Sequence, residues 1–349
     1  MWTPIILLAL VPPAFSWRTG SHGVQWDENC DYSGNDLYSK PSTGEQCGDL
    51  CASDSSCTYF PIHYGNGYSV CGYIQEREGD GDGVPYGRLA VSEKGIVSAA
   101  TGQPVQLRGM SLFWSQWMGQ FYNADTVQAL KCSWNTNVVR AAMGVEQDGY
   151  LSNPERELQK VFSVVDAAIA NGMYVIVDWH DHNAINHQSQ APYHEAVIAA
   201  IRANDPDNII VVGTPNWSQY VDEAANDPIT NYKNIAYTLH YYAGTHKQDL
   251  RNRATAALNK GLPLFVTEYG TVNADGGGAV DTNESNLWWN FLDENQISYV
   301  NWALDDKDEG SAALIPGTTS QQVGDDSRLT ASGRFVKDKY KSQNNGVHC

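Results

Sequence analysis

Positive charge is scarce in this sequence. Its 349 residues include 22 Lys and Arg against 40 Asp and Glu, which gives a formal net charge of −18 at pH 7. A nucleic acid or an anionic membrane surface would repel such a chain, so we expect neither as a partner. The charge does not exclude a neutral polymer as a ligand.

Long hydrophobic runs are also missing beyond the N-terminus, although 42% of the residues are hydrophobic. The apolar run from Ile5 to Phe15 is too short to span a bilayer. It is followed by the small-x-small pattern Ala14-Phe15-Ser16, which predicts a secretory signal peptide over residues 1–16 and no membrane partner after its removal. A buried N-terminal strand or a membrane anchor is the alternative interpretation.

Seven cysteines are present, and an odd number leaves at least one thiol unpaired or bonded outside the chain. Five of them precede the Gly/Asp-rich segment Glu76–Pro85. This pattern predicts a disulfide-stabilised module over residues 17–75, a linker over 76–86 and a larger domain over 87–349. Secretion into an oxidising compartment would allow these disulfides to form.

The cysteine spacing in the module is similar to that of PAN/apple domains. The matching residues are Cys47, Cys51, Cys57 and Cys71. The resemblance implies that Cys51 pairs with Cys57 and Cys47 with Cys71, which leaves Cys30 without its usual partner. Such modules bind carbohydrate or protein.

The larger domain has no Gly-x-Gly-x-x-Gly after its first strand-like run, which argues against a dinucleotide-binding sheet. Short apolar runs instead alternate with longer amphipathic ones, as in a parallel β/α array with strands buried on both faces. We expect an α/β fold, a TIM-type (β/α)8 barrel that lacks one βα unit, because only seven strand-like runs are present. The expected strands are Val105–Leu107 with Met110–Phe113, Asn137–Met143, Met173–Trp179, Asn208–Gly213, Ile235–Tyr242, Leu262–Tyr269 and Ile297–Leu304. The expected helices are Asn123–Cys132, Pro154–Asn171, Tyr193–Ala203, Leu250–Lys260 and Glu284–Glu294.

The strand-like runs end on polar and aromatic residues that are typical of a functional site. In a β/α barrel the carboxyl ends of all strands open onto one face, so residues distant in sequence meet there. Eleven Trp and nineteen Tyr add flat rings, which can stack on the apolar faces of sugars. The strand-end residues are Arg140, His180, Thr214, Trp217, His240, Tyr242, Glu268 and Trp302.

Glu268 is the most informative of these residues. The apolar run that begins at Phe265 delivers this one carboxylate into an aromatic turn that Gly270 closes, a pattern typical of a catalytic group. Cleavage of a glycosidic bond uses two carboxylates, because one attacks or stabilises the sugar while the other protonates the leaving oxygen. The sequence offers no evident partner for Glu268.

Together these segments resemble the secreted endo-β-1,4-glucanases (cellulases) of glycoside hydrolase family 5, from about Pro85 to the C-terminus. The resemblance implies a retaining hydrolase of cellulose or a related β-glucan, a monomer that needs no metal and no organic cofactor. The matching segments are Leu107–Gly109, Asn137–Ala142, Tyr174–His180, Val212–Gln219, Phe265–Gly270, Asn301–Leu304 and Ser311–Leu314.

The resemblance also implies a role for each matching residue. Glu268 is the expected nucleophile, and Arg140 is expected to keep it ionised. His240 and Tyr242 are expected around the nucleophile and the leaving group. The expected contacts of the sugar are His180 and Trp302 at the reacting ring and Trp117, Trp217, Lys307 and Glu309 at the outer rings.

Two nearby positions are not expected to contact the sugar. Asp178 is interpreted as structural, with a side chain that points away from the cleft relative to His180. Phe113 stands where the family often has a histidine, so one sugar contact of the family is not expected here.

The acid/base glutamate of the family has no counterpart in this chain. In the family it ends a fourth strand in the motif Asn-Glu-Pro, which is absent here, and the residues up to Ala191 run directly into Pro192, where the helix after that strand begins. Roughly one βα repeat, about 30 residues, is therefore missing. Asp181, Glu146 and Asp305 lie near the expected face, but each belongs to a different strand end, so we expect none of them to substitute.

The missing repeat leaves several interpretations open. The first is an incomplete or spliced glucanase, whose hydrolysis is impaired without the acid/base residue. A non-catalytic glucan-binding protein is an alternative, and so is a β-mannanase on the same scaffold. The Lys307-Asp308-Glu309 and Thr214–Ser218 segments favour the glucanase by resemblance.

Overall fold

The computed structural model describes residues 83–93, 95–182 and 190–349, with the backbone alone at 190–193. Before residue 83 it describes only the backbone of short strands. The chain divides into two compact units, Met1–Leu10 with Gly81–Cys349 and Val11–Asp80. The predicted signal cleavage site lies outside the described residues.

The unit Val11–Asp80 contains short antiparallel strands. The pairs are β2 (Arg18–Thr19) with β3 (Gln25–Trp26), and β6 (Tyr68–Gly72) with both β4 (Ser39–Ser42) and β5 (Ile62–Gly65). The side chains of its cysteines lie outside the described residues, so the PAN/apple-like module and its disulfide pairs stay predictions.

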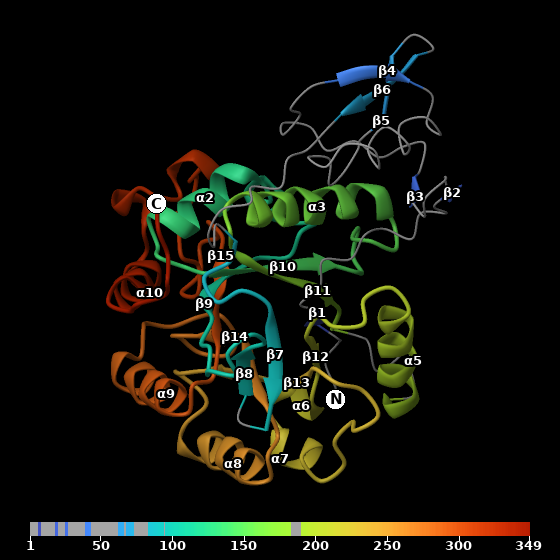
Figure 1. Ribbon diagram of the computed structural model, residues 1–349. Coiled ribbons are helices and arrows are strands. Elements are labelled where there is room, and N and C mark those ends of the chain that lie inside the picture. Colours follow the sequence, from blue (N-terminus) through green and yellow to red (C-terminus); the bar gives the residue numbers. More distant parts are fainter. Residues whose placement is uncertain are drawn as a thin grey trace. The chain divides into compact units, whose positions relative to one another are not determined.

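Within the described part of the larger unit, seven parallel strands curl into a barrel (Figure 1). Their order is β11, β10, β9, β15, β14, β13, β12, and each neighbouring pair is parallel. Each strand matches a predicted apolar run, which confirms the TIM-type fold with seven strands. The strands are β9 (Arg108–Leu112), β10 (Val138–Gly144), β11 (Tyr174–His180), β12 (Ile210–Val212), β13 (Ile235–Tyr242), β14 (Leu264–Gly270) and β15 (Tyr299–Leu304).

Helices surround the sheet (Figure 1). Those predicted from the sequence are α2 (Ala124–Cys132), α3 (Pro154–Ala170), α5 (Gln190–Arg202), α8 (Gln248–Asn259) and α9 (Thr282–Glu294). Those not predicted are α6 (Pro215–Ser218), α7 (Val221–Ala224) and α10 (Ala331–Lys341). None of the helices in the described ranges is long and apolar enough to cross a membrane.

A gap in the parallel sheet separates β11 from β12. The two-residue strand β1 (Ile6–Leu7) lies between them and pairs antiparallel with both. The gap falls where one βα repeat is predicted to be missing, because β11 precedes and β12 follows the junction of Ala191 and Pro192. β1 belongs to the predicted signal peptide, so cleavage after residue 16 would leave the facing edges of β11 and β12 unpaired.

The core explains why one end of the barrel is free to carry polar groups. Every residue of β10 and β15 is buried, as expected for strands covered on both faces. Apolar side chains fill the barrel toward the amino ends of the strands, and the carboxyl ends carry the polar and aromatic residues. The filling side chains include Leu107, Val138, Ile176, Val211, Ala236, Phe265 and Val300.

A disulfide between Cys132 and Cys349 joins the end of α2 to the C-terminus, with the two Cα atoms 5.6 Å apart. The sequence analysis did not identify this pair, because the two residues are separated by 217 positions. Five cysteines remain in the first 71 residues, so the odd thiol belongs to that part of the chain.

We expect the double variant Cys132→Ser/Cys349→Ser to lower the free energy of unfolding by about 3–5 kcal/mol, because the link restricts a very long loop in the unfolded chain. Urea denaturation followed by tryptophan fluorescence measures the change. The single variant Cys132→Ser serves as the control, because it breaks the same disulfide and leaves the other cysteines unchanged, and it should match the double variant. A double variant as stable as the oxidised parent would contradict this account of the disulfide.

Candidate active site

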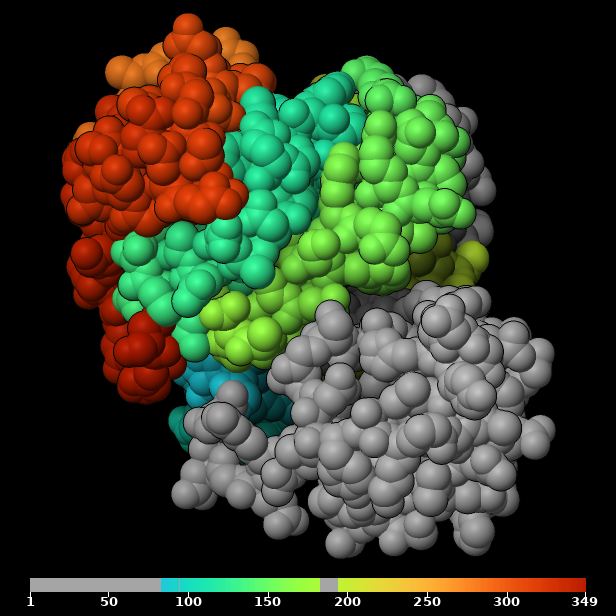
Figure 2. All heavy atoms as spheres, turned by 90° about the horizontal axis from the view of Figure 1, so that it is seen from above, coloured from blue at the N-terminus to red at the C-terminus, as the bar shows by residue number. Residues whose placement is uncertain are grey.

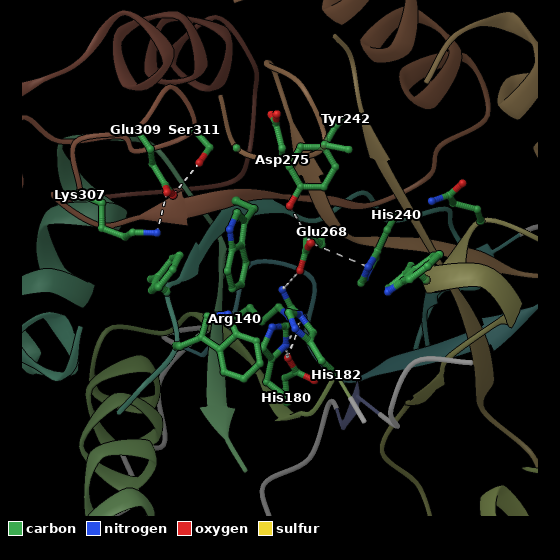
Figure 3. Close-up of a pocket in the computed structure, with 18 of the residues that line it drawn as sticks. Arg140, His180, His182, His240, Tyr242, Glu268, Asp275, Lys307, Glu309 and Ser311 are labelled. Carbon is green, nitrogen blue, oxygen red and sulfur yellow. Dashed lines mark hydrogen bonds and ion pairs between the residues drawn. The ribbon is translucent and has the colours of Figure 1, made fainter. Parts of the chain in front are cut away.

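Glu268 lies on β14 and lines a pocket at the carboxyl ends of the strands (Figure 3). Its side chain is 12% exposed. Arg140 Nη1 donates a hydrogen bond to Glu268 Oε2 at 3.0 Å, and the Tyr242 hydroxyl donates to Oε1 at 2.8 Å. Nδ1 of His240 lies 4.0 Å from the same Oε1. The three side chains predicted around the nucleophile therefore meet at its carboxylate.

The strands place these side chains. His240 on β13 is in register with Glu268 on β14, and Tyr242 shares the face of His240 because alternate residues of a strand point the same way. The pairing is irregular between Thr238 and His240. Nε2 of His240 lies 2.9 Å from the Thr267 hydroxyl, which fixes the ring beside the carboxylate.

The surroundings of Glu268 keep it ionised. Burial alone would raise the pKa of Glu268, but electrostatic interactions with His240, Arg140 and His180 and the Tyr242 hydrogen bond lower it to about 2. Burial lowers the pKa of His240 to about 4, so at pH 7 His240 is neutral and Arg140 supplies the facing charge. The carboxylate is therefore available as a nucleophile at neutral pH.

Arg140 also binds a second carboxylate. Its Nη2 donates to Asp178 Oδ2 at 2.6 Å, and that oxygen lies 2.7 Å from Nδ1 of His180. Asp178 is fully buried and lines the pocket, so the interpretation that it points away from the cleft is wrong. Asp178 and His180 are two residues apart on β11 and so share one face. Asp178 thereby orients both the guanidinium and the imidazole.

An aromatic wall borders the nucleophile. The rings of Trp302 and His180 stack with centroids 5.2 Å apart and planes 21° apart, and a cis peptide bond joins Trp302 to Ala303. Phe113 packs 5.2 Å from the Trp302 ring, and Nζ of Lys307 lies 4.5 Å from the centroid of Phe113. Phe113, which stands where the family often has a histidine, therefore supports this wall and does not contact a sugar hydroxyl directly.

Of the residues predicted to contact the outer sugar rings, only some line the pocket. Lys307 pairs with Glu309 at 2.5 Å, and both line the pocket together with Trp217, whose side chain is 47% exposed. Trp117 is not part of this lining; its ring packs 5.1 Å from that of Trp114. A contact between Trp117 and an outer sugar stays a prediction.

Several lining residues were overlooked in the sequence. His182 continues the alternation of Asp178 and His180, and that spacing alone could have revealed it. His246 accepts the backbone N–H of Tyr242 on Nδ1 at 2.9 Å, a contact that depends on the turn after β13. Trp114, Ala274, Asp275 and Gly276 were also overlooked, and Gln219 and Ser311, which belong to the matching segments, had no role predicted.

The pocket has a volume of about 510 Å³, within the usual range of small-molecule sites. Among the described residues, no group of three or more His, Cys, Asp or Glu is placed to hold a metal ion.

The carboxylates that line this pocket, besides Glu268, are Asp178, Asp181, Asp275 and Glu309. Asp178 and Glu309 are held in ion pairs, and Asp275 is exposed and accepts the N–H of Gly277 at 2.9 Å. Asp181 is buried just beyond the end of β11.

Of the three carboxylates near the expected face that the sequence pointed out, Asp181 alone lines the pocket. Glu146 is not among its residues. Asp305 is fully buried outside it, where Oδ1 accepts the N–H of Lys307 at 2.9 Å and burial raises its pKa to about 7. Asp305 is thus protonated over part of the neutral range but cannot touch a ligand in the pocket.

The family model for cellulase (glycosyl hydrolase family 5) matches residues 98–192 and 186–308. The chain belongs to this family. Endoglucanase Z of Dickeya dadantii (strain 3937) is 50% identical over 268 residues, which cover 66% of this chain and 61% of that protein. The chain spans about three-fifths of the length of the first curated relatives it matches.

Solved structures agree with this membership. A structure from Cytophaga hutchinsonii has a TM-score of 0.71 and 47% identity, and the match covers 74% of this chain and 95% of that one. The catalytic domain of Thermobifida fusca endoglucanase Cel5A in complex with cellotetraose has a TM-score of 0.68 and 30% identity, with coverage of 74% and 100%.

The family match is interrupted at the junction found in the sequence. Its two pieces overlap at residues 186–192, where one βα repeat is predicted to be missing. The alignment with Endoglucanase Z is 268 positions long but includes only 66% of the 349 residues of this chain. At some aligned positions Endoglucanase Z therefore has a residue and this chain has none.

We expect Tyr242→Phe to raise the pKa of Glu268, because the carboxylate loses the hydroxyl bound to Oε1. A hydrogen bond to a charged group contributes about 1.5–3 kcal/mol, equivalent to about one to two pH units. The depressed pKa stabilises the fold above the ordinary value of 4.5, and this stabilisation is lost as the pH falls toward 2. The variant should therefore lose less unfolding free energy than the parent between pH 6 and pH 2.

Tyr241→Phe is the matched control for this measurement. Tyr241 is the adjacent residue on β13, fully buried on the other face, and its hydroxyl has no hydrogen-bond partner. Its removal should leave the pH dependence of stability as in the parent. The same change in both variants would mean that the Tyr242 hydroxyl does not set the pKa of Glu268.

Proposed function

We propose that this chain is a retaining endo-β-1,4-glucanase by descent, which binds cellulose or a related β-glucan in the pocket around Glu268. The observation that carries the proposal is the carboxylate of Glu268, ionised by Arg140 and Tyr242 beside the Trp302 ring. The endoglucanase names of its relatives support the same activity, and the cellotetraose complex of one structural relative supports the ligand class.

In this proposal Glu268 attacks the anomeric carbon of a sugar that rests on Trp302. Arg140 keeps the nucleophile charged, and the Tyr242 hydroxyl holds its second oxygen. His180 and His240 offer hydrogen bonds to the sugar and to the departing oxygen. The covalent glycosyl ester would then be hydrolysed by water with retention of configuration.

The proposed reaction also needs an acid/base residue that protonates the leaving oxygen, and this residue is what the site lacks. We infer that the strand carrying the acid/base glutamate is missing, which the two-piece family match supports. General acid/base assistance is worth about 10² to 10⁴ in rate, so hydrolysis of ordinary glucan should be impaired by a comparable factor. An incomplete or spliced sequence accounts for this gap, since the residues on both sides match the family.

Secretion is part of the proposal. The predicted signal peptide and the Cys132–Cys349 disulfide both fit an oxidising compartment. We propose further that the mature protein acts as a monomer without a cofactor, and that the cysteine-rich module assists attachment to carbohydrate or protein.

We expect the chain to release reducing ends from carboxymethylcellulose about 10² to 10⁴ times more slowly than a version completed with the fourth βα unit of Endoglucanase Z between Ala191 and Pro192. A reducing-sugar assay compares the two. Glu268→Gln should abolish the activity of the completed version, while Glu294→Gln, the same change at an exposed position of α9, should leave it unchanged. Near-normal turnover by the chain itself, lost in Glu268→Gln, would contradict the inferred impairment.

Non-catalytic glucan binding is the second candidate, because the absence of an acid weakens cleavage more than it weakens binding. Retention on cellulose without new reducing ends, even from the completed version, would favour it. Release of reducing ends from mannan but not from carboxymethylcellulose would instead favour the β-mannanase. Transcript sequencing across the codons of Ala191 and Pro192 would show whether an in-frame exon is omitted.

A further inference from the structure

We propose that Asp305 is a positioning residue for the outer part of the pocket: it holds the turn after β15 in the conformation that brings Lys307 and Glu309 together as an ion pair facing the ligand. The inference rests on the proposed function, because the ligand concerned is a β-glucan whose outer sugar contacts this pair. It assigns a role to a buried carboxyl group that does not line the pocket and takes no part in the proposed reaction.

Asp305 begins the turn directly after Leu304, the last residue of β15. Its Oδ1 accepts the N–H of Lys307 at 2.9 Å, and its backbone oxygen accepts the N–H of Leu314 at 3.0 Å. An aspartate that accepts the backbone N–H two residues ahead closes a tight turn, which an apolar side chain cannot do. Asp305 therefore fixes the point from which the side chain of Lys307 leaves the backbone.

The ion pair of Lys307 and Glu309 depends on the shape of this turn. Nζ of Lys307 lies 2.5 Å from Glu309 Oε2 and 4.5 Å from the centroid of the Phe113 ring (Figure 3). Both side chains of the pair are partly exposed. An exposed ion pair contributes little stability by itself, about 0–1 kcal/mol, so it is too weak to hold the turn in place. The turn must therefore hold the pair.

The Glu309 end of the pair has its own anchor in the loop after β14. The Ser311 hydroxyl donates to Glu309 Oε1 at 2.9 Å, and the Ser311 N–H donates to the backbone oxygen of Gly276 at 2.9 Å. A Cβ atom at Gly310 would lie 2.3 Å from the backbone oxygen of Gly278, so the two loops come this close only because Gly310 has no side chain. Asp305 supplies the matching anchor at the Lys307 end.

The middle of the turn is held from outside. Asp306 Oδ1 accepts from Gln120 Nε2 at 3.3 Å, and its Oδ2 accepts the N–H of Gly317 at 2.9 Å. The orange-red surface of the chain after β15 lies beside the teal surface of the segment that contains Gln120 (Figure 2). The turn is thus enclosed on several sides, and Asp305 is its fully buried member.

Asp305 performs this task as a mostly neutral group at mildly acidic pH. Its second oxygen, Oδ2, is buried and has no hydrogen-bond partner in the described part of the chain, and Nζ of Lys307 is paired with Glu309. Burial, together with the negative charge of Glu309, raises the pKa of Asp305 to about 7. At pH 6 most molecules therefore carry a protonated Asp305. Asparagine has nearly the same shape and keeps an acceptor oxygen, so it is the matched replacement.

Calorimetry of the full chain with cellotetraose at pH 6 tests the proposal. Asp305→Ala should weaken binding about tenfold, as for the loss of one hydrogen bond to a charged group. Asp305→Asn should bind as the parent does, because it still accepts the N–H of Lys307. Asp308→Ala, which makes the alanine change at an exposed position of the same turn, is the control and should also bind as the parent does.

A double-mutant cycle distinguishes positioning of the ion pair from a general loosening of the fold. Lys307→Met removes the charge that Asp305 is proposed to place. In that background Asp305→Ala should change the affinity for cellotetraose by less than about twofold. The same tenfold loss in both backgrounds would mean that Asp305 does not act through the pair and would overturn the proposal.

Hydrogen exchange measured by NMR gives a test that does not require Asp305→Ala to fold. In the parent and in Asp305→Asn, the amide of Lys307 should exchange about tenfold more slowly than the amide of the exposed Asp308. Equally fast exchange of the two amides would overturn the proposed anchor.

The binding results also separate this inference from the proposed function. Unchanged cellotetraose affinity in a folded Asp305→Ala variant would overturn the role of Asp305 and leave glucan binding standing. Failure of the parent itself to bind cellotetraose would overturn the proposed function, and this inference with it.

Discussion

The bridge from Arg140 to Glu268 and Asp178 is the interaction on which the site depends. A guanidinium buried at the centre of a barrel is tolerated only when it is paired, and here it is paired twice, at 3.0 and 2.6 Å. The bridge joins β10, β11 and β14, so it fixes the relative positions of three strand ends. It also links the fold to the proposed chemistry, because the charge that compensates Arg140 is that of Glu268, the proposed nucleophile. His180, Tyr242 and Trp302 are arranged around this pair of carboxylates.

The proposed loss of one βα repeat and the gap in the parallel sheet fall at the same place in the chain. Between β11 and β12 the parallel pairing is interrupted, and in this structure the two residues of β1 pair with both edges. In a TIM barrel the carboxyl ends of several strands contribute side chains to the site. A strand that is missing would therefore also remove its side chain from the site. The partners of Glu268 come from β10 and β13, each of which is separated from the gap by one strand. These contacts therefore form although the parallel pairing between β11 and β12 is interrupted.

Much of the fold could be predicted from the sequence, and the failures have identifiable causes. The seven strands were recognised because both of their faces are buried, which leaves continuous apolar runs such as Ile235–Tyr242. Helix α10 was missed because its buried face, which includes Val336 and Tyr340, is interspersed with lysines. The pair of Cys132 and Cys349 could not be found, since nothing local in the sequence brings residues 217 positions apart together. Asp178 was misinterpreted although its spacing from His180 in a strand was sufficient to place both on one face.

The sequence by itself determined the family of this protein and the seven-strand barrel, because apolar periodicity and strand-end motifs are local features of the chain. It also predicted Glu268 as the nucleophile and a missing repeat at the junction of Ala191 and Pro192, where the order of the motifs is interrupted. Only the tertiary structure decided that Asp178 supports Arg140, that Trp117 lies outside the pocket lining and that Asp305 is sealed from it. These facts depend on side-chain distances across strands that are far apart in sequence, and no local pattern encodes such distances.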